Sequence, residues 1–217
     1  MTGVLVRQLR ADEIGGAAAL LSRGMRDNPI HERVFGADPV HRELALLRLF
    51  TALLGQDQHK GTVLGAFSAD TMVGVCALIP PGRCQPLLRE RMGLVKALAR
   101  DNLTNLFAAL RWSSGWARHD PSAPHWHLGP VGVERDLQGK GIGSALLTAF
   151  RDLVDANHGL AYLETDKSIN VPFYQRFGFE VTTESPILGV PCWFMVRPRS
   201  TRESSESAIV KVDEGGV

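Results

Sequence analysis

The sequence predicts an α/β (α+β) fold in which a mixed, mostly antiparallel sheet is covered by helices. Residues 62–79 form two apolar runs around an Ala69-Asp70 turn, the pattern of an antiparallel hairpin. From residue 125 onward, strand-like runs alternate with helical ones. A hairpin followed by such alternation implies a mixed sheet with helices packed on it. No linker marks a domain boundary, so we expect residues 1–198 to form one domain.

The region before the hairpin is expected to be mainly helical. Asp38 can cap one helix, Pro39 suits its first position and Gly55 suits its end. The dipeptide Asn28-Pro29 is expected to end an earlier helix. The predicted elements of the first 118 residues, besides the hairpin, are a strand at 4–9 and helical stretches at 11–25, 38–56 and 86–118.

The second half carries the clearest periodicity. Apolar residues of the stretch 141–157 recur on one helix face, which makes it the strongest helix in the sequence. The polar, serine-rich residues 199–217 are expected to be a mobile tail. The predicted strands are 125–133, 160–165, 179–184 and 190–197, and a second, short helix is expected at 170–177.

Composition excludes several classes of protein. The 217 residues carry a formal net charge of only +1, so no strong field favours nucleic acid. No apolar run approaches the roughly 20 residues of a membrane span, and the N-terminus does not resemble a signal peptide. The three cysteines are sparse, which suits a reducing compartment. We therefore expect a cytoplasmic protein without nucleic-acid or membrane partners, and leave a homodimer open.

The stretch "QGKGIG" at 138–143 places Gly139, Gly141 and Gly143 at the mouth of the strongest helix. Backbone N–H groups at a helix start lack partners within the helix, and the helix dipole adds positive charge there. Glycines let an anion approach those groups closely. The P-loop and dinucleotide-fold patterns are both absent, so the loop predicts a phosphate cradle of another kind.

The preceding strand contains Gly129 and Pro130, which predict a bulge, because proline cannot donate to a sheet ladder. A bulged strand is expected to separate from its neighbour and leave amide groups unpaired. An extended amide chain could bind to such an edge. Coenzyme A combines a diamide arm with a pyrophosphate. The unpaired strand edge suits the diamide arm, and the glycine loop suits the pyrophosphate.

The motif "QGKGIG" fits the Q/R-x-x-G-x-G/A signature of the GCN5-related N-acetyltransferase (GNAT) family. The stretch "NVPFYQRFGFEV" resembles the second family signature, an asparagine followed by a short helix bearing tyrosine before Gly-Phe. The stretches "WHLGPVGVERDLQGKGIGSALL", "YLETDKSINVPFYQRFGFEV" and "GVPCWFMVRP" are similar to the puromycin N-acetyltransferase branch. The resemblance covers roughly residues 4–198, with 86–118 matching in helical character only.

The resemblance implies a GNAT-like sheet splayed between its fourth and fifth strands, with acetyl-CoA as co-substrate. It implies acetyl transfer to an amine in a ternary complex. The backbone of Val131 and Val133 would hold the pantetheine arm, and Asn170 and Tyr174 would lie along its other side. The residues implied to hold the pyrophosphate are Gln138, Gly139, Lys140, Gly141, Ile142, Gly143 and Ser144.

Three residues are candidates for catalysis. The resemblance implies that Tyr174 is the acid that protonates the departing thiolate, although its ring could instead only pack. His127 lies eleven residues before Gln138, where the histone acetyltransferases of the family carry a glutamate. Histidine is a suitable base near neutral pH. Glu164 could orient the amine or relay its proton. His127 could equally be a strand histidine bonded to a carbonyl, and Glu164 a solvated strand end.

We expect no metal site. His119, Asp120, His125 and His127 form only a weak zinc pattern, without cysteine. Trp112 and Trp116, four apart on a predicted helix, could line a substrate pocket in a lid formed by 86–118, or could be ordinary helix packing.

The sequence therefore predicts an N-acetyltransferase for the primary amine of a small molecule. Two alternatives stay open: a protein or peptide N-acetyltransferase, and a non-catalytic module that binds acyl-CoA.

Overall fold

The structure is a computed structural model that describes residues 3–84, 88–99 and 103–200. The predicted tail lies outside these residues from position 201 onward, as do positions 86–87 and 100–102 of the predicted lid. No helix within the described ranges is both long and apolar enough to cross a lipid bilayer.

The centre of the fold is a mixed sheet with the strand order β1-β2-β3-β4-β5-β7-β6. Among the described strands, β4 and β5 alone pair in parallel, and every other neighbouring pair is antiparallel. This confirms the predicted mixed, mostly antiparallel sheet. The strands are β1 (Leu5–Gln8), β2 (Thr62–Ser68), β3 (Thr71–Ile79), β4 (His125–Val133), β5 (Leu160–Thr165), β6 (Glu180–Ile187) and β7 (Val190–Arg197).

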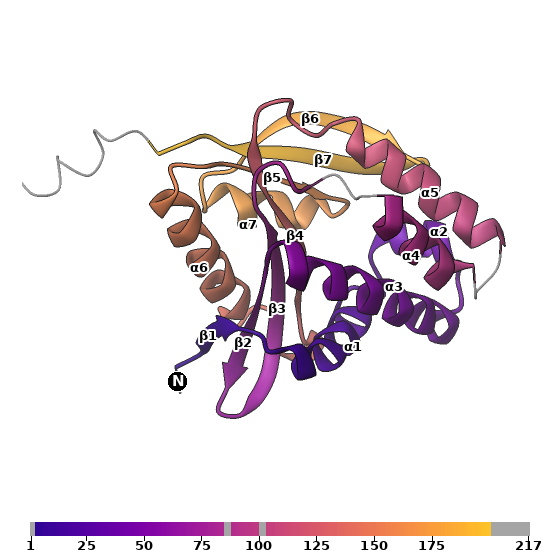
Figure 1. The fold of residues 1–217 in the computed structure, drawn as a ribbon, viewed down its shortest axis with the longest axis horizontal. Coiled ribbons are helices and arrows are strands. Elements are labelled where there is room, and N and C mark those ends of the chain that lie inside the picture. The colour runs from indigo at the N-terminus through magenta and orange to yellow at the C-terminus, as the bar shows by residue number, and fades with distance from the viewer. Residues whose placement is uncertain (1–2, 85–87, 100–102, 201–217) are drawn as a thin grey trace, which may run out of the picture.

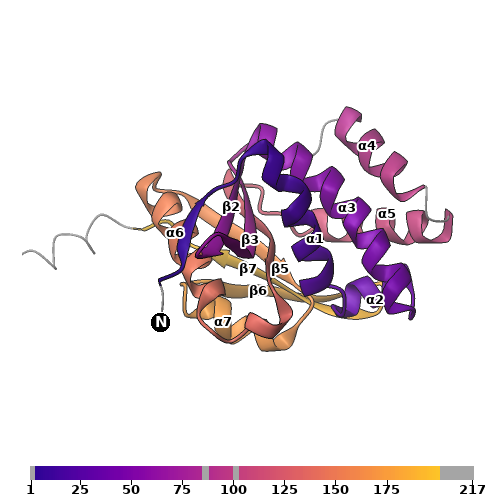
Figure 2. The same ribbon diagram turned by 90° about the horizontal axis from the view of Figure 1, so that it is seen from below.

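Helices cover both faces of the sheet. Helices α6 and α7 lie on one side and α1 to α5 on the other, as the two views in Figures 1 and 2 show. The helices are α1 (Ile14–Gly24), α2 (Pro29–Phe35), α3 (Pro39–Lys60), α4 (Leu88–Leu98), α5 (Leu103–Ala117), α6 (Ile142–Ala156) and α7 (Val171–Gln175), with short 3-10 turns η1 (Ala11–Glu13), η2 (Arg135–Leu137) and η3 (Ser168–Asn170).

Two apolar clusters fill the spaces on either side of the sheet. The cluster under α1 to α5 includes Leu21, Phe50, Trp112 and Tyr162. The cluster under α6 and α7 is built from the apolar face of α6, with Phe150 at its centre, and includes Tyr174. Residues of β5 alternate between the two clusters, because successive side chains of a strand point to opposite faces: Ala161 and Leu163 belong to the cluster under α6 and α7, and Tyr162 to the other.

Two predictions about the N-terminal helices were wrong. Pro29 does not merely end a helix; it occupies the first turn of α2, where its missing N–H costs nothing. Gly55 does not end α3, which continues to Lys60 and stops before Gly61. The predicted cap was confirmed, because the side chain of Asp38 accepts a hydrogen bond from the backbone N–H of Val40 at 3.0 Å.

Helix α1 approaches β4 very closely. A Cβ atom at Gly24 would lie 2.8 Å from the carbonyl oxygen of Val133, and one at Gly132 would lie 2.6 Å from a methyl carbon of Leu21. Real Cβ atoms do not approach other atoms so closely, so Gly24 needs glycine against the backbone of β4, and any side chain at Gly132 would require Leu21 to shift. This contact braces β4 from the side opposite α6.

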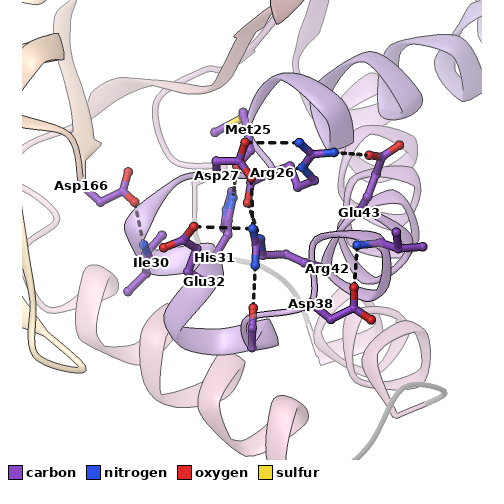
Figure 3. Close-up of polar contacts among 12 residues, drawn as sticks. Met25, Arg26, Asp27, Ile30, His31, Glu32, Asp38, Arg42, Glu43 and Asp166 are labelled. Carbon is purple, nitrogen blue, oxygen red and sulfur yellow. Dashed lines mark hydrogen bonds and ion pairs between the residues drawn. The ribbon is translucent and has the colours of Figure 1, made fainter.

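Arg42 joins the first three helices, as Figure 3 shows. Its buried guanidinium donates to the carbonyls of Arg26 and Gly36, each at 2.7 Å, and to the carboxylate of Asp27 at 3.0 Å. A buried charge of this kind is stable only when it is paired and hydrogen-bonded. The network fixes α2 against α3.

A second contact in Figure 3 ties α2 to the sheet. The buried carboxylate of Asp166, which follows β5, accepts a hydrogen bond from the backbone N–H of Ile30 at 2.8 Å. It therefore satisfies one of the free N–H groups at the start of α2. Helix α2 is held at the end of β5, beside the predicted reaction centre.

Candidate active site

Strands β4 and β5 pair only over three residues and then separate. The parallel pairing stops at His127 and Tyr162, although each strand continues beyond that point. Opposite Ala77 of β3, the strand β4 carries Gly129 and Pro130 as extra residues, because Cys76 pairs with Val131 and Leu78 with Leu128. This is the predicted bulge. The edge of β4 beyond His127 that faces β5 has no strand partner in the described part of the chain.

The unpaired edge leads directly to the glycine loop. Val131 and Val133 are half-buried on this part of β4, and the loop after it opens α6. Gly139 and Gly141 have φ angles of +76° and +85°, which residues other than glycine rarely adopt. A Cβ atom at either position would meet nothing within 4 Å, so the space above the loop is open.

The start of α6 is a suitable place for an anion. Gly141 stands at the N-cap position and makes no side-chain capping bond, so it leaves the first N–H groups of the helix free to bind an anion. Gln138 and Lys140 are exposed beside it, and Gly143 and Ser144 lie half-buried in the first turn. The side-chain amide of Gln138 donates to the carbonyl of Val133 at 3.3 Å, which ties the loop to the end of β4. Ile142 is buried and anchors the helix to the core.

The second sequence motif lies on the α6–α7 side of the sheet. Tyr174 is buried on α7, with its ring 5.3 Å from that of Phe173 and 6.1 Å from that of Phe179. Burial, with smaller contributions from Glu164 and Asp166, raises the pKa of Tyr174. Its hydroxyl therefore stays protonated and able to donate. Asn170 occupies the N-cap position of α7 but makes no side-chain capping bond; its side-chain amide donates to the hydroxyl of Thr165 at 3.3 Å.

His127 and Glu164 form a pair on the opposite side of the sheet. The imidazole Nε2 of His127 lies 3.2 Å from Oε1 and 3.0 Å from Oε2 of Glu164, and the hydrogen-bond geometry is satisfied at Oε1. Burial lowers the pKa of His127, but Glu164 and Cys84 outweigh this effect and raise it well above the ordinary value. The pair is therefore neither an exposed strand end nor a histidine bonded to a carbonyl.

Two further residues lie against this pair, and the sequence analysis had connected only one of them, His125, with His127. The thiol of Cys84, just beyond the end of β3, and the imidazole of His125 belong to one compact group with His127, in which the candidate ligand atoms all lie within 4.8 Å of one another. Burial alone would raise the pKa of the Cys84 thiol, but contacts with His125 and His127 lower it to about 7.

Several buried polar atoms around the pair have no hydrogen-bond partner among the residues that the structure describes. The hydroxyl of Tyr162 is one, and its ring lies 5.3 Å from that of His127. Burial, followed by nearby Glu164, raises the pKa of Tyr162. Buried polar groups normally find a partner, so this face of β4 and β5 is equipped to bind a polar molecule. The remaining unpartnered atoms are Nε1 of Trp112, Nε1 of Trp116, Nε2 of His125 and Oε2 of Glu164.

The tryptophans of α5 lie on the same side of the sheet. Their rings are 5.0 Å apart in an edge arrangement, and Trp112 also contacts the ring of the buried His31 at 5.4 Å. Both belong to the apolar cluster under α1 to α5. His119, which the sequence placed near the histidines of β4, instead stacks on Phe194 at 3.9 Å.

The sequence analysis missed Cys84, Tyr162 and Asp166, and named His125 only as part of a weak zinc pattern. Strand periodicity carried a signal for Tyr162, because it lies two residues from Glu164 and therefore faces the same side of the sheet. Cys84 gave no local signal. It is 41 residues from His125 and reaches it only because β3 pairs with β4.

Comparison with known proteins agrees with this arrangement. The family model described as acetyltransferase (GNAT) family matches residues 29–179, which span both the splayed strands and both motifs.

Three solved structures share the fold at low sequence identity. A histone acetyltransferase HPA2 and related acetyltransferase from Corynebacterium glutamicum is 20% identical with a TM-score of 0.67, covering 91% of this chain and 97% of that one. A GNAT family acetyltransferase from Brucella melitensis in complex with acetyl-CoA is 14% identical with a TM-score of 0.52, covering 93% and 91%. A polyamine N-acetyltransferase from Drosophila melanogaster is 14% identical with a TM-score of 0.57, covering 89% and 99%.

Proposed function

Because the chain belongs to the GNAT family of acetyltransferases, we propose that it moves an acetyl group from acetyl-CoA to a primary amine of a small molecule, by direct transfer in a ternary complex. The observation that carries this proposal is the end of pairing between β4 and β5 at His127 and Tyr162. It leaves a gap bordered by His127 and Glu164 on one face of the sheet and by Tyr174 on the other.

The donor would lie along the unpaired edge of β4. The backbone amides of Val131 and Val133 would hold the pantetheine arm as a neighbouring strand would. The pyrophosphate would bind at the loop from Gln138 to Gly143 and at Ser144, where helix N–H groups are uncapped. Asn170 and Tyr174 would border the arm from the side of α7. The acetyl-CoA complex of the Brucella melitensis relative supports this choice of donor.

The transfer requires three proton or charge events. The attacking amine must be neutral, so a base accepts its proton; His127, oriented by its 3.2 Å hydrogen bond to Glu164, is placed for that role. Only the neutral imidazole can accept a proton, and because the pKa of His127 is raised, this role requires a pH above the ordinary range of histidine. The amine nitrogen then bonds to the acetyl carbon and forms a tetrahedral intermediate. The carbon–sulfur bond breaks as the amide forms, and the hydroxyl of Tyr174 donates a proton to the departing thiolate.

The covered side of the sheet favours a small acceptor. Helices α4 and α5, within the predicted lid, lie on the same side of the sheet as His127 and Glu164; α5 packs against β6, and α4 packs on the outside of α3 (Figure 2). The unpartnered polar atoms of Tyr162, Trp112 and Trp116 are buried on that side. A polar small molecule can satisfy such atoms, and the polyamine acetyltransferase among the structural relatives supports an amine acceptor.

The test is a screen of small primary amines, together with lysine-containing and free N-terminal peptides, against acetyl-CoA. Thiol release and product mass are measured together. We expect acetylated small amines, and initial-rate lines that intersect when both substrates are varied, which is the pattern of a ternary complex.

Three results would contradict the proposal. Acetylation of peptides alone would move the acceptor class to proteins. Binding of acetyl-CoA without thiol release would favour a non-catalytic module. Parallel rate lines with an acetyl group trapped on Cys84 would replace direct transfer by a covalent intermediate.

A further inference from the structure

Cys84, His125 and His127 form a cluster of side chains that the transfer mechanism does not need as a set. Ile79, the last residue of β3, pairs with His127, and the chain returns after it so that Cys84 lies beside β4. One nitrogen of each histidine and the sulfur of Cys84 all lie within 4.8 Å of one another. The side chain of His125 is buried, and those of Cys84 and His127 are half-buried.

The hydrogen bonds of His125 fix which of its nitrogens is available. Its Nδ1 lies 2.9 Å from the carbonyl oxygen of Ala123. A carbonyl can only accept, so Nδ1 carries the proton and Nε2 carries a lone pair. That Nε2 is buried and has no hydrogen-bond partner within the described residues. A buried lone pair normally finds a partner. The thiol of Cys84 lies beside His125, where it donates to the backbone carbonyl of that residue at 3.8 Å.

In His127 the two ring nitrogens have the opposite roles: Nε2 is the one held by a hydrogen bond, and Nδ1 is the one left available. Its Nε2 faces the carboxylate of Glu164 at 3.2 Å, which leaves Nδ1 for another contact. In metal sites, a ligating histidine almost always donates its second ring N–H to a backbone carbonyl or a carboxylate. His125 has the carbonyl of Ala123 and His127 has the carboxylate of Glu164.

We propose that Sγ of Cys84, Nε2 of His125 and Nδ1 of His127 form a three-ligand site for Zn²⁺, with a fourth position left for solvent or substrate. Thiolate and imidazole are the ligands that zinc prefers, and three protein ligands are typical of open zinc sites. With Zn–S near 2.3 Å and Zn–N near 2.0–2.1 Å, tetrahedral ligand atoms lie roughly 3.3–3.6 Å apart. Side-chain rotation over about 1 Å would close the present cluster to that geometry.

Zinc at this position would inhibit acetyl transfer. This part of the inference rests on the proposed function, in which His127 accepts the proton of the amine. A metal-bound imidazole has no lone pair left for that proton, so zinc and base catalysis exclude each other. Removal of zinc with a chelator would restore activity without any change in the covalent structure.

Binding is tested on the full-length, chelator-treated protein without acetyl-CoA. Zn²⁺ binding is measured by calorimetry, and Co²⁺ is used as a spectroscopic substitute. We expect one Zn²⁺ per chain, together with the near-ultraviolet thiolate-to-cobalt band and the visible bands of tetrahedral cobalt. Cys84→Ser should abolish the thiolate band and weaken Zn²⁺ binding by more than about 100-fold, since loss of a second-sphere partner alone costs 10–100-fold.

Two further variants complete the test. Glu164→Gln, which keeps the size of the side chain, should weaken Zn²⁺ binding by roughly 10–100-fold, as expected for a residue that positions a ligand. His59→Ala removes an exposed histidine of α3 and should leave both Zn²⁺ affinity and activity unchanged. Melting curves of the metal-free proteins verify that the variants are folded.

Equal Zn²⁺ affinity of the wild type and Cys84→Ser, or a cobalt spectrum without a thiolate band, would overturn the site. Zn²⁺ binding with the expected spectrum but no loss of acetyl transfer would overturn the inhibition. Failure of the proposed function is distinguishable, because the calorimetric and spectroscopic results do not depend on any transfer activity.

Discussion

Nε2 of His127 lies 3.0 Å from Oε2 of Glu164, although their strands stop pairing at His127 and Tyr162. The contact therefore bridges β4 and β5 at the point where they separate. It places a base and the residue that orients it at the apex of the gap in which acetyl-CoA is proposed to bind.

The first prediction concerns this pair. His127→Ala should lower kcat by roughly 10²–10⁴-fold, the usual contribution of general acid–base catalysis, while acetyl-CoA affinity changes little. Added imidazole should partly restore turnover, because a small base can occupy the vacated space. The measurements are kcat with and without imidazole, and calorimetric binding of acetyl-CoA. A variant that retains wild-type kcat would transfer the role of base to Glu164 or to water.

The second prediction concerns Tyr174. Phenylalanine keeps the packed ring and removes only the hydroxyl, so folding and acetyl-CoA affinity should be preserved. We expect Tyr174→Phe to lower kcat by a factor near the lower end of 10²–10⁴, since a thiolate can leave without full protonation. The readout is kcat under conditions where chemistry limits turnover. Unchanged turnover there would mean that Tyr174 only packs.

The third prediction concerns the anion site at the glycine loop. Asparagine tolerates the left-handed conformation better than most residues, so Gly141→Asn preserves the backbone at φ +85°. Gly141→Asp has nearly the same size and adds a negative charge. Two like charges about 4 Å apart repel by about 1 kcal/mol in water and about 4 kcal/mol near a protein surface.

Acetyl-CoA should therefore bind Gly141→Asp at least about fivefold more weakly than Gly141→Asn. The measurement is calorimetric affinity, with the rise in melting temperature on adding acetyl-CoA as a second readout. Equal affinity of the two variants would place the pyrophosphate elsewhere.

The fourth prediction concerns the tryptophans of α5. If the region 86–118 forms the wall of the acceptor site, Trp116→Phe should raise the KM for the amine far more than the KM for acetyl-CoA, because it removes the indole N–H but keeps an aromatic ring. Trp112→Phe should act in the same direction. Steady-state kinetics with each substrate varied in turn give the two constants. Equal changes in both constants, or a lower melting temperature with unchanged kinetics, would identify the pair as core packing.

The fifth prediction concerns Asp57, a carboxylate of α3 that is only 2% exposed. Burial raises its pKa from 3.8 to about 7, despite the ammonium of Lys60 at 3.8 Å. Since the folded pKa lies above the unfolded one, the folded state favours the protonated carboxyl. Stability is therefore lost as pH rises from about 4 and levels off above about 7.

Asp57→Asn removes this loss. The gain in the free energy of unfolding should be about 2–3 kcal/mol larger at pH 8 than at pH 5, because each unit of pKa shift corresponds to 1.36 kcal/mol. Denaturant unfolding of both proteins at the two pH values gives the difference. Destabilisation at pH 8 would show instead that the pair of Asp57 with Lys60 stabilises the ionised form.

The sequence by itself determined the parts of the protein whose signals are local. The bounds of β4 and β5, the hairpin of β2 and β3, and the glycine loop before α6 follow from alternation, turn residues and capping within a few positions. The bulge at Gly129 and Pro130 was also predicted, because proline cannot take part in a sheet ladder. The same local patterns carried the two motifs that identified the family.

Only the tertiary structure decided what meets at the reaction centre. Cys84 and His125 are 41 residues apart in sequence, and strand pairing, not local propensity, brings them together. Helix α2 was missed because its start signal coincides with the end of α1, and it is held in place by Arg42 and Asp166 from other elements. Burial of Asp57 and the contact of His127 with Glu164 likewise depend on packing across the sheet. Such pairings arise from the global burial of apolar surface, which no short stretch of sequence encodes.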